Sequence, residues 1–95
     1  MVVTVHSKPG CPHCDVAVAL LSDLGVPFQK VMYMPDSSDY ERRRDDLFSL
    51  YSHRSFPHIL VGDTFLGGLR ELKAAIASTR LDKLLAESGV YIDRF

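Results

Sequence analysis

The two cysteines of this chain, Cys11 and Cys14, lie at the boundary between an expected strand and an expected helix. The apolar run Val2 to His6 precedes them, and the stretch Asp15 to Leu24 that follows has helical periodicity. A helix N-terminus presents unpaired N–H groups and about half a positive charge, which stabilise a thiolate. Since the thiolate is the nucleophile in disulfide exchange, this placement of a dithiol favours redox chemistry.

Length, composition and charge restrict what kind of protein this is. The 95 residues are expected to form a single domain over 1–95, and a hydrophobic fraction of 46% is enough for a core without disulfide staples. A net charge of −1 argues against a nucleic-acid partner. The first apolar run is too short for a signal peptide and no run is long enough for a membrane span. We therefore expect a soluble monomer of the reducing cytoplasm.

Hydrophobic periodicity and turn residues predict alternating strands and helices. The expected strands are 2–6, 28–32, 57–61 and 64–66, and the expected helices are 12–24, 40–53, 69–78 and 81–88. The order β-α-β-α-β-β-α, with a short extra C-terminal helix, is that of a thioredoxin-like α/β fold. Such a fold has a four-stranded mixed sheet flanked by helices.

Local signals also predict helix ends and core positions. Ser38 or Asp39 is expected to cap the second helix, and Gly25 to end the first. The charges of residues 42–44 are expected to lie on a solvated helix face balanced by neighbouring acids. The apolar tail 90–95 either packs back on the fold or meets a partner. The predicted core positions are Val16, Leu20, Leu21, Ile76 and Leu84.

Three motifs make the chain similar to glutaredoxins over nearly its whole length, from Val2 to Glu87. The family's order and spacing are kept, which makes the resemblance specific. The motifs are the active-site loop Ser7-Lys8-x-x-Cys11-Pro12-x-Cys14, the cis-proline segment Arg54-Ser55-Phe56-Pro57 and the glycine pair in Phe65-Leu66-Gly67-Gly68.

The resemblance implies a glutathione-dependent thiol–disulfide oxidoreductase with no bound cofactor or metal. Glutathione would be the reductant, and disulfide-bearing or glutathionylated proteins would be the substrates, with ribonucleotide reductase a typical acceptor in the family. The position of Cys11 at the helix tip predicts an exposed nucleophile, and Pro12 suits the first helical position. Cys14, one turn further on, is expected to be the less accessible resolving thiol. Either Cys14 or glutathione would displace the mixed disulfide formed on Cys11.

The same resemblance implies a glutathione-binding site made from three segments. Lys8 and Arg54 match positions that hold the glycyl carboxylate. A cis bond between Phe56 and Pro57 would present the backbone of Phe56 to an extended peptide such as glutathione. The backbone N–H groups of Gly68-Leu69, which open the third helix, would bind the glutamyl carboxylate.

Two residues depart from the family pattern. His13 stands where an aromatic residue is usual, and it resembles the arrangement in strongly oxidising bacterial disulfide-forming enzymes. An imidazole there is expected to stabilise ionised Cys11 and raise the reduction potential, unless it merely faces solvent. Arg70 stands where many members have an aspartate. It would grip a substrate carboxylate but repel the glutamyl ammonium, unless it simply points to solvent beside an acid.

Two other functions stay open at this point. The first is a redoxin that looks like a glutaredoxin but is recharged by thioredoxin reductase, which Arg70 favours. The second belongs to a different class, a binding module whose dithiol holds zinc or an iron–sulfur cluster. Pro12 argues against the cluster, because cluster-binding members of the family usually carry a smaller residue there.

Overall fold

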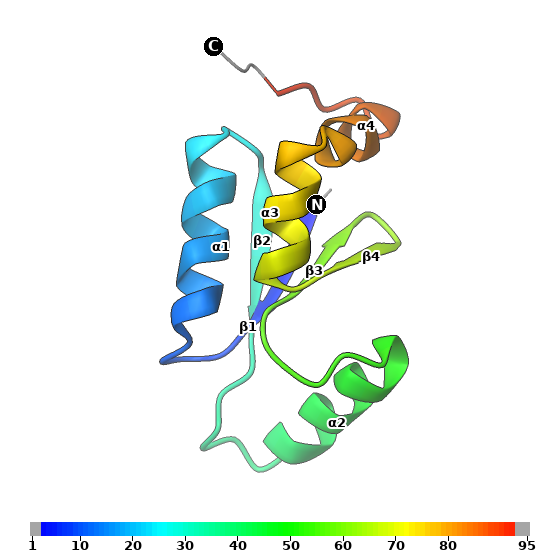
Figure 1. Cartoon of the computed structure of the whole chain (residues 1–95). Coiled ribbons are helices and arrows are strands. Elements are labelled where there is room, and N and C mark those ends of the chain that lie inside the picture. The colour runs from blue at the N-terminus through cyan, green and yellow to red at the C-terminus, as the bar shows by residue number, and fades with distance from the viewer. Residues whose placement is uncertain (1–2, 93–95) are drawn as a thin grey trace.

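The computed structural model describes residues 3–92. Its four strands form one sheet in the spatial order β2-β1-β3-β4 (Figure 1). β1 (Val3–Ser7) is parallel to β2 (Phe28–Met32) and antiparallel to β3 (His58–Val61). β3 is also antiparallel to β4 (Thr64–Gly67). The helices are α1 (Pro12–Asp23), α2 (Tyr40–Tyr51), α3 (Leu69–Ala77) and α4 (Arg80–Glu87). The predicted α/β fold, with its mixed sheet and extra C-terminal helix, is confirmed.

The main core lies between one face of the sheet and the helices α1 and α3, which run side by side in Figure 1. Side chains alternate along a strand, so Val3 and Val5 of β1 point to this face and are fully buried. α4 closes the end of this core. Full burial of a leucine contributes roughly 1.5–3 kcal/mol, so this cluster is the main source of stability. Its leucines are Leu21, Leu66, Leu72, Leu81 and Leu85.

One predicted core position is wrong. Val16 is 40% exposed, because the buried face of α1 runs through Cys14, Ala17 and Leu21 instead. Leu21 is fully buried as expected. The three remaining predicted positions are half-buried and pack against the core: Leu20, Ile76 and Leu84.

The opposite face of the sheet carries α2, which packs through aromatic rings. Phe48 stacks on His58 of β3 with ring centroids 5.3 Å apart, and Tyr51 stacks on Phe65 of β4 at 4.4 Å. Helix α2 ends at Tyr51 rather than near His53, because Ser52 turns into the left-handed region with φ 52°. The sheet therefore separates an aliphatic core from an aromatic one.

The N-terminus of α2 differs in detail from the prediction. Asp39 occupies the N-cap position but makes no capping hydrogen bond, because its carboxylate accepts from the Ser37 hydroxyl at 2.6 Å. The expected charge balance holds for Arg42, which lies 3.7 Å from Asp39 and 3.6 Å from Asp46. Arg43 does not follow it, since its guanidinium lies 4.3 Å from the centre of the Tyr33 ring.

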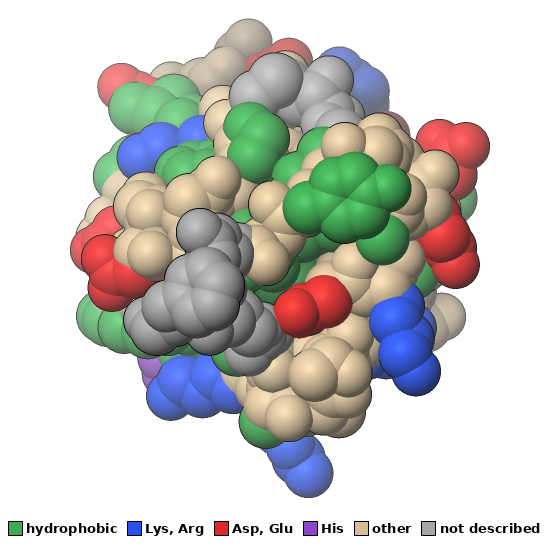
Figure 2. Space-filling view, turned by 90° about the horizontal axis from the view of Figure 1, so that it is seen from above, with side chains coloured by type: hydrophobic (Ala, Val, Ile, Leu, Met, Phe, Trp, Pro, Cys, Tyr) green, Lys and Arg blue, Asp and Glu red, His purple; other side chains and the backbone are tan. Residues whose placement is uncertain are grey.

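The segment after α4 packs back on the fold as far as it is described. Val90 and Ile92 contact the main core, whereas Tyr91 is 80% exposed. On the end of the molecule that carries α4, hydrophobic side chains lie among acidic and basic ones (Figure 2). The rest of the apolar tail, residues 93–95, falls outside the described residues. Within residues 3–92, no helix is long and apolar enough to cross a membrane.

His58 is a fully buried polar side chain within the aromatic core. Its Nε2–H donates to the carbonyl of His53 at 2.8 Å, and its Nδ1 has no partner among the described residues. Burial is the main cause that lowers the pKa of His58 to about 4, because desolvation disfavours the imidazolium. Burial also lowers the pKa of His6, followed by the charge of Arg43.

We expect acid to destabilise the fold through His58. Above its unfolded pKa of 6.5 the group is neutral in both states, and below 6.5 only the unfolded state takes up the proton. The free energy of unfolding should therefore fall between pH 6.5 and about 4, by up to about 3 kcal/mol. Urea denaturation across this range measures the slope.

The matched variants for this prediction are His58→Gln and His13→Gln. Glutamine keeps a donor for the His53 carbonyl and does not titrate. His58→Gln should therefore reduce the pH dependence of the free energy of unfolding to the smaller part that is due to His6. His13 is exposed, and its substitution controls for the loss of a histidine. An equal slope in wild type and His58→Gln would contradict this assignment.

Candidate functional site

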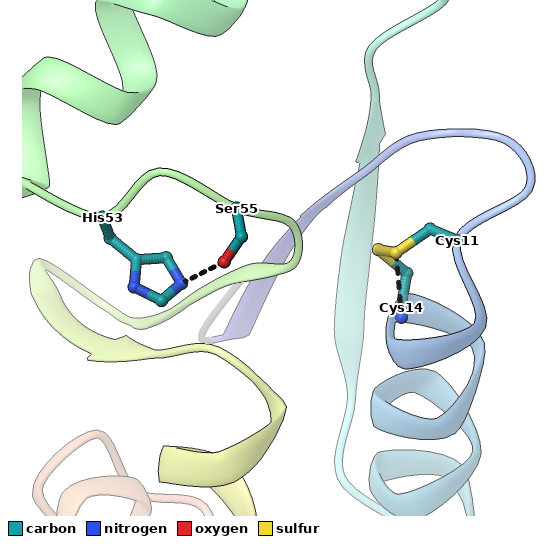
Figure 3. The surroundings of a disulfide bond; sticks show 4 residues. All are labelled: Cys11, Cys14, His53 and Ser55. Carbon is teal, nitrogen blue, oxygen red and sulfur yellow. Dashed lines mark hydrogen bonds between the residues drawn. A yellow bond between two sulfur atoms is a disulfide. The ribbon is translucent and has the colours of Figure 1, made fainter.

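The N-terminus of α1 carries a disulfide between Cys11 and Cys14 (Figure 3). Cys11 is the N-cap residue with extended backbone (φ −110°), and Pro12 opens the helix. The backbone N–H of Cys14 donates to Sγ of Cys11 at 3.2 Å. The Cys11 sulfur thus accepts one of the N–H groups that a helix N-terminus leaves unpaired, which is the contact that would stabilise a thiolate there.

Both cysteines are buried in this oxidised form. Cys14 is the less accessible, as expected, with 2% of its surface exposed. The prediction that Cys11 is exposed is wrong for this state, since 7% of its surface reaches solvent. The cause is a cluster of side chains from distant segments that covers the disulfide. It contains Tyr33, Leu47 and Phe56.

The loop between α2 and β3 supplies the opposite wall of the site. The peptide bond between Phe56 and Pro57 is cis, as predicted. The ring of Phe56 lies 5.3 Å from that of Tyr33 and 5.3 Å from that of Phe48. On the same loop, the Ser55 hydroxyl lies 3.3 Å from Nε2 of His53, on the far side of the site from the disulfide (Figure 3).

A first groove of about 530 Å³ lies between this loop and α2. Three cationic side chains line it: the predicted Lys8 and Arg54, and Arg44, which the sequence analysis had placed on a solvated face. Arg44 bonds the neighbouring Asp45 through Nε and Nη2 at 3.2 and 3.1 Å. An anion in this groove would therefore meet the two predicted cations, Lys8 and Arg54. It would also meet Arg44, whose charge Asp45 partly neutralises.

A second groove, of about 560 Å³, lies between the same loop and the start of α3. It shares Ser55 and Phe56 with the first groove, so the loop forms a wall of both. Its predicted lining residues are His13, Pro57, Gly68, Leu69 and Arg70, and those the sequence analysis did not single out are His53, Glu71 and Lys73.

The N-terminus of α3 is capped by Glu71, a residue of the same helix. Glu71 Oε1 accepts the backbone N–H of Gly68 at 2.8 Å, so this N–H, expected to receive a substrate carboxylate, is already used. Gly67 makes room for the Glu71 side chain, and Gly68 makes room for His53. A Cβ on Gly67, whose φ is 129°, would lie 2.5 Å from Cγ of Glu71, and one on Gly68 would lie 3.2 Å from Nε2 of His53.

Tyr33 shares a buried cluster with the two cysteines and contacts a histidine of β1. The Tyr33 hydroxyl lies 3.0 Å from Nδ1 of His6. Burial raises the pKa of Tyr33, against smaller opposing effects of Arg43, and burial lowers the pKa of His6. Burial thus favours the neutral form of both rings. The charge beside them is the guanidinium of Arg43, 4.3 Å from the centre of the Tyr33 ring.

Sequence reasoning missed several of these residues for separate reasons. The helical spacing from Arg70 to Lys73 puts both on one face, and this signal would have found Lys73. The N-cap-to-N3 spacing from Gly68 to Glu71 would have found the cap. Tyr33 and Arg44 carry no local signal, because only the packing of α2 brings them to the site. Among residues 3–92, no group of three or more His, Cys, Asp or Glu side chains is placed to hold a metal ion.

Comparison with known proteins gives one consistent family. Residues 3–66 match the family model described as glutaredoxin. Glutaredoxin 3 of Escherichia coli K12 is 31% identical over 83 residues, which cover 87% of this chain and 95% of that protein. Oxidized glutaredoxin 2 from Chlamydomonas reinhardtii is 32% identical, with a TM-score of 0.78 over 93% of this chain and 82% of that one. A buckwheat glutaredoxin–glutathione complex is similar in fold, with a TM-score of 0.85, 23% identity and coverage of 95% and 81%.

Proposed function

Because this chain belongs to the glutaredoxin family of thiol–disulfide oxidoreductases, we propose that it reduces protein disulfides and glutathione mixed disulfides, with glutathione as its reductant. The observation that carries the proposal is the disulfide at the N-cap of α1, where the Cys14 N–H reaches the Cys11 sulfur. A reducing compartment such as the cytoplasm would keep this dithiol available.

The reduced protein acts through two sulfur atoms. The Cys11 thiolate attacks a substrate disulfide, one substrate sulfur leaves as a thiolate, and a mixed disulfide remains on Cys11. The Cys14 thiolate then attacks Cys11 and releases the second substrate thiolate, which leaves the disulfide seen here. The difference in exposure supports these roles, because Cys11 is the more accessible of the two.

Recharging uses two molecules of glutathione. The first thiolate attacks Cys11 and expels Cys14 as a thiolate, which takes up a proton. The second attacks the glutathione sulfur on Cys11, so glutathione disulfide leaves and the Cys11 thiolate is restored. A fold neighbour from buckwheat was solved as a glutathione complex, which supports glutathione as the co-substrate.

The first groove is the proposed place for the glycyl carboxylate of glutathione. Lys8 and Arg54 line it together with Phe56, which also packs against the disulfide. A carboxylate there would be held by charge-assisted contacts while the sulfur of glutathione faces Cys11. His13 is exposed at the tip of α1, and its effect on the reduction potential stays a prediction.

We expect Cys11→Ser to abolish every disulfide exchange, because Cys11 would carry each covalent intermediate. Cys14→Ser should still release glutathione from a glutathionylated peptide, since free glutathione resolves that intermediate, but should no longer reduce an intramolecular protein disulfide. Both activities are measured on the same purified variants. Retained activity of Cys11→Ser, or loss of both activities in Cys14→Ser, would refute these roles.

We expect Lys8→Ala and Arg54→Ala to raise the KM for glutathione without slowing alkylation of Cys11. Arg54 is exposed and Lys8 is half-buried, so each substitution should raise the KM for glutathione about two- to fivefold. This is the effect expected for the loss of a solvent-screened ion pair. Lys30→Ala, an exposed lysine on β2 outside both grooves, is the matched control. If the two groove variants keep the KM of wild type and of Lys30→Ala, the carboxylate site lies elsewhere.

A further inference from the structure

We propose that the second groove selects thiols whose distal end is a carboxylate with no ammonium beside it. The inference rests on the proposed function and specifies which small-thiol disulfide that site takes. It is carried by the charges of the groove between the loop 52–57 and the start of α3.

The charges that face this groove come from α3. Arg70 and Lys73 are both exposed, and they lie three residues apart on one face of the helix. The carboxylate that lines the groove with them belongs to Glu71. Two full positive charges against one negative charge leave the groove with an excess of positive charge when its histidines are neutral. An anionic group is therefore favoured and a cationic one opposed.

One oxygen of this carboxylate holds the helix end. Glu71 is half-buried and folded back over the start of α3, where Oε1 accepts the Gly68 N–H at 2.8 Å. The bond fixes the side chain beside Gly67, whose missing Cβ leaves the room that Glu71 occupies. Moving Glu71 away would leave that N–H without its partner, at a cost comparable to losing an N-cap, so its single negative charge stays at the helix end.

The remaining polar groups are suited to an anion as well. Ser55 and His53 line the groove from the opposite loop, and their side chains contact each other at 3.3 Å (Figure 3). A hydroxyl and an imidazole can each donate a hydrogen bond to a carboxylate. His13, which lies between Cys11 and Cys14 in the first turn of α1, also lines this groove, so the groove reaches the helix tip that carries the disulfide.

Glutathione matches this groove incompletely. Its glutamyl end carries a carboxylate, which Arg70 and Lys73 attract, and an adjacent ammonium, which they repel. Removing only that ammonium gives glutaryl-cysteinyl-glycine, which keeps every other group. This analogue is expected to be the better substrate, and the pair of molecules isolates the interaction.

The test uses a fluorescent peptide joined by a mixed disulfide to either glutathione or glutaryl-cysteinyl-glycine. Pre-reduced full-length protein is mixed with an excess of each, and peptide release gives two second-order rate constants whose ratio is the measure. For wild type we expect the glutaryl compound to react about two- to fivefold faster, the scale of solvent-screened charge pairs. Arg70→Asp should reverse the order, because two negative charges against the one positive charge of Lys73 would turn the excess charge of the groove negative.

The control is Arg80→Asp, which makes the same change in the first turn of α4, outside the groove. It should keep the wild-type ratio. Arg70→Asp should fold at least as well as wild type, since an acidic side chain in the first turn of a helix is favourable, and a thermal melt checks this.

The possible results distinguish the selectivity of the second groove from the proposed function of the protein. A wild-type protein that releases peptide from both compounds but prefers glutathione, or an Arg70→Asp ratio equal to wild type, overturns the selectivity and leaves the proposed function intact. Failure to release peptide from either compound overturns the proposed function and the selectivity with it.

Discussion

The packing of the disulfide into an aromatic cluster is the interaction on which the site depends. Cys11 and Cys14 come from the start of α1, whereas Phe56 comes from the loop before β3 and Tyr33 from the end of β2. Their contact joins segments that are far apart in the sequence. It sets the distance between the two reactive sulfurs and the loop 52–57, and both grooves share that loop as a wall.

Much of the fold was predictable from the sequence, because strand and helix periodicities are local properties. The placement of the dithiol at a strand-to-helix boundary was predictable in the same way, whereas the cis bond before Pro57 and the role of the glycine pair were implied by the resemblance to glutaredoxins. The burial of Cys11 was not predictable, because the rings that cover it belong to distant segments. The same holds for Arg43, which was expected on the solvated face of α2 but packs on the ring of Tyr33. Contacts between side chains of different elements depend on tertiary packing, which cannot be predicted from the periodicity of a single helix.

Charge divides the site into parts with different tasks. Burial favours the neutral form of His6 and Tyr33, and the guanidinium of Arg43 lies beside the Tyr33 ring. Other cations line the grooves, with Lys8 and Arg54 in one groove and Arg70 in the other. Thiol–disulfide exchange takes place at the helix tip, and in our proposal the two grooves select the thiol that reaches it. In the same proposal Arg70 affects this selection and not the exchange step.

The most direct test of the central claim compares two ways of recharging the protein. One cuvette contains glutathione, glutathione reductase and NADPH, and the other contains thioredoxin reductase and NADPH, with the same disulfide substrate in both. Oxidation of NADPH that depends on this protein is the readout. Our account predicts turnover in the glutathione cuvette and its loss in Cys11→Ser. Turnover with thioredoxin reductase alone, and none with glutathione, would contradict it.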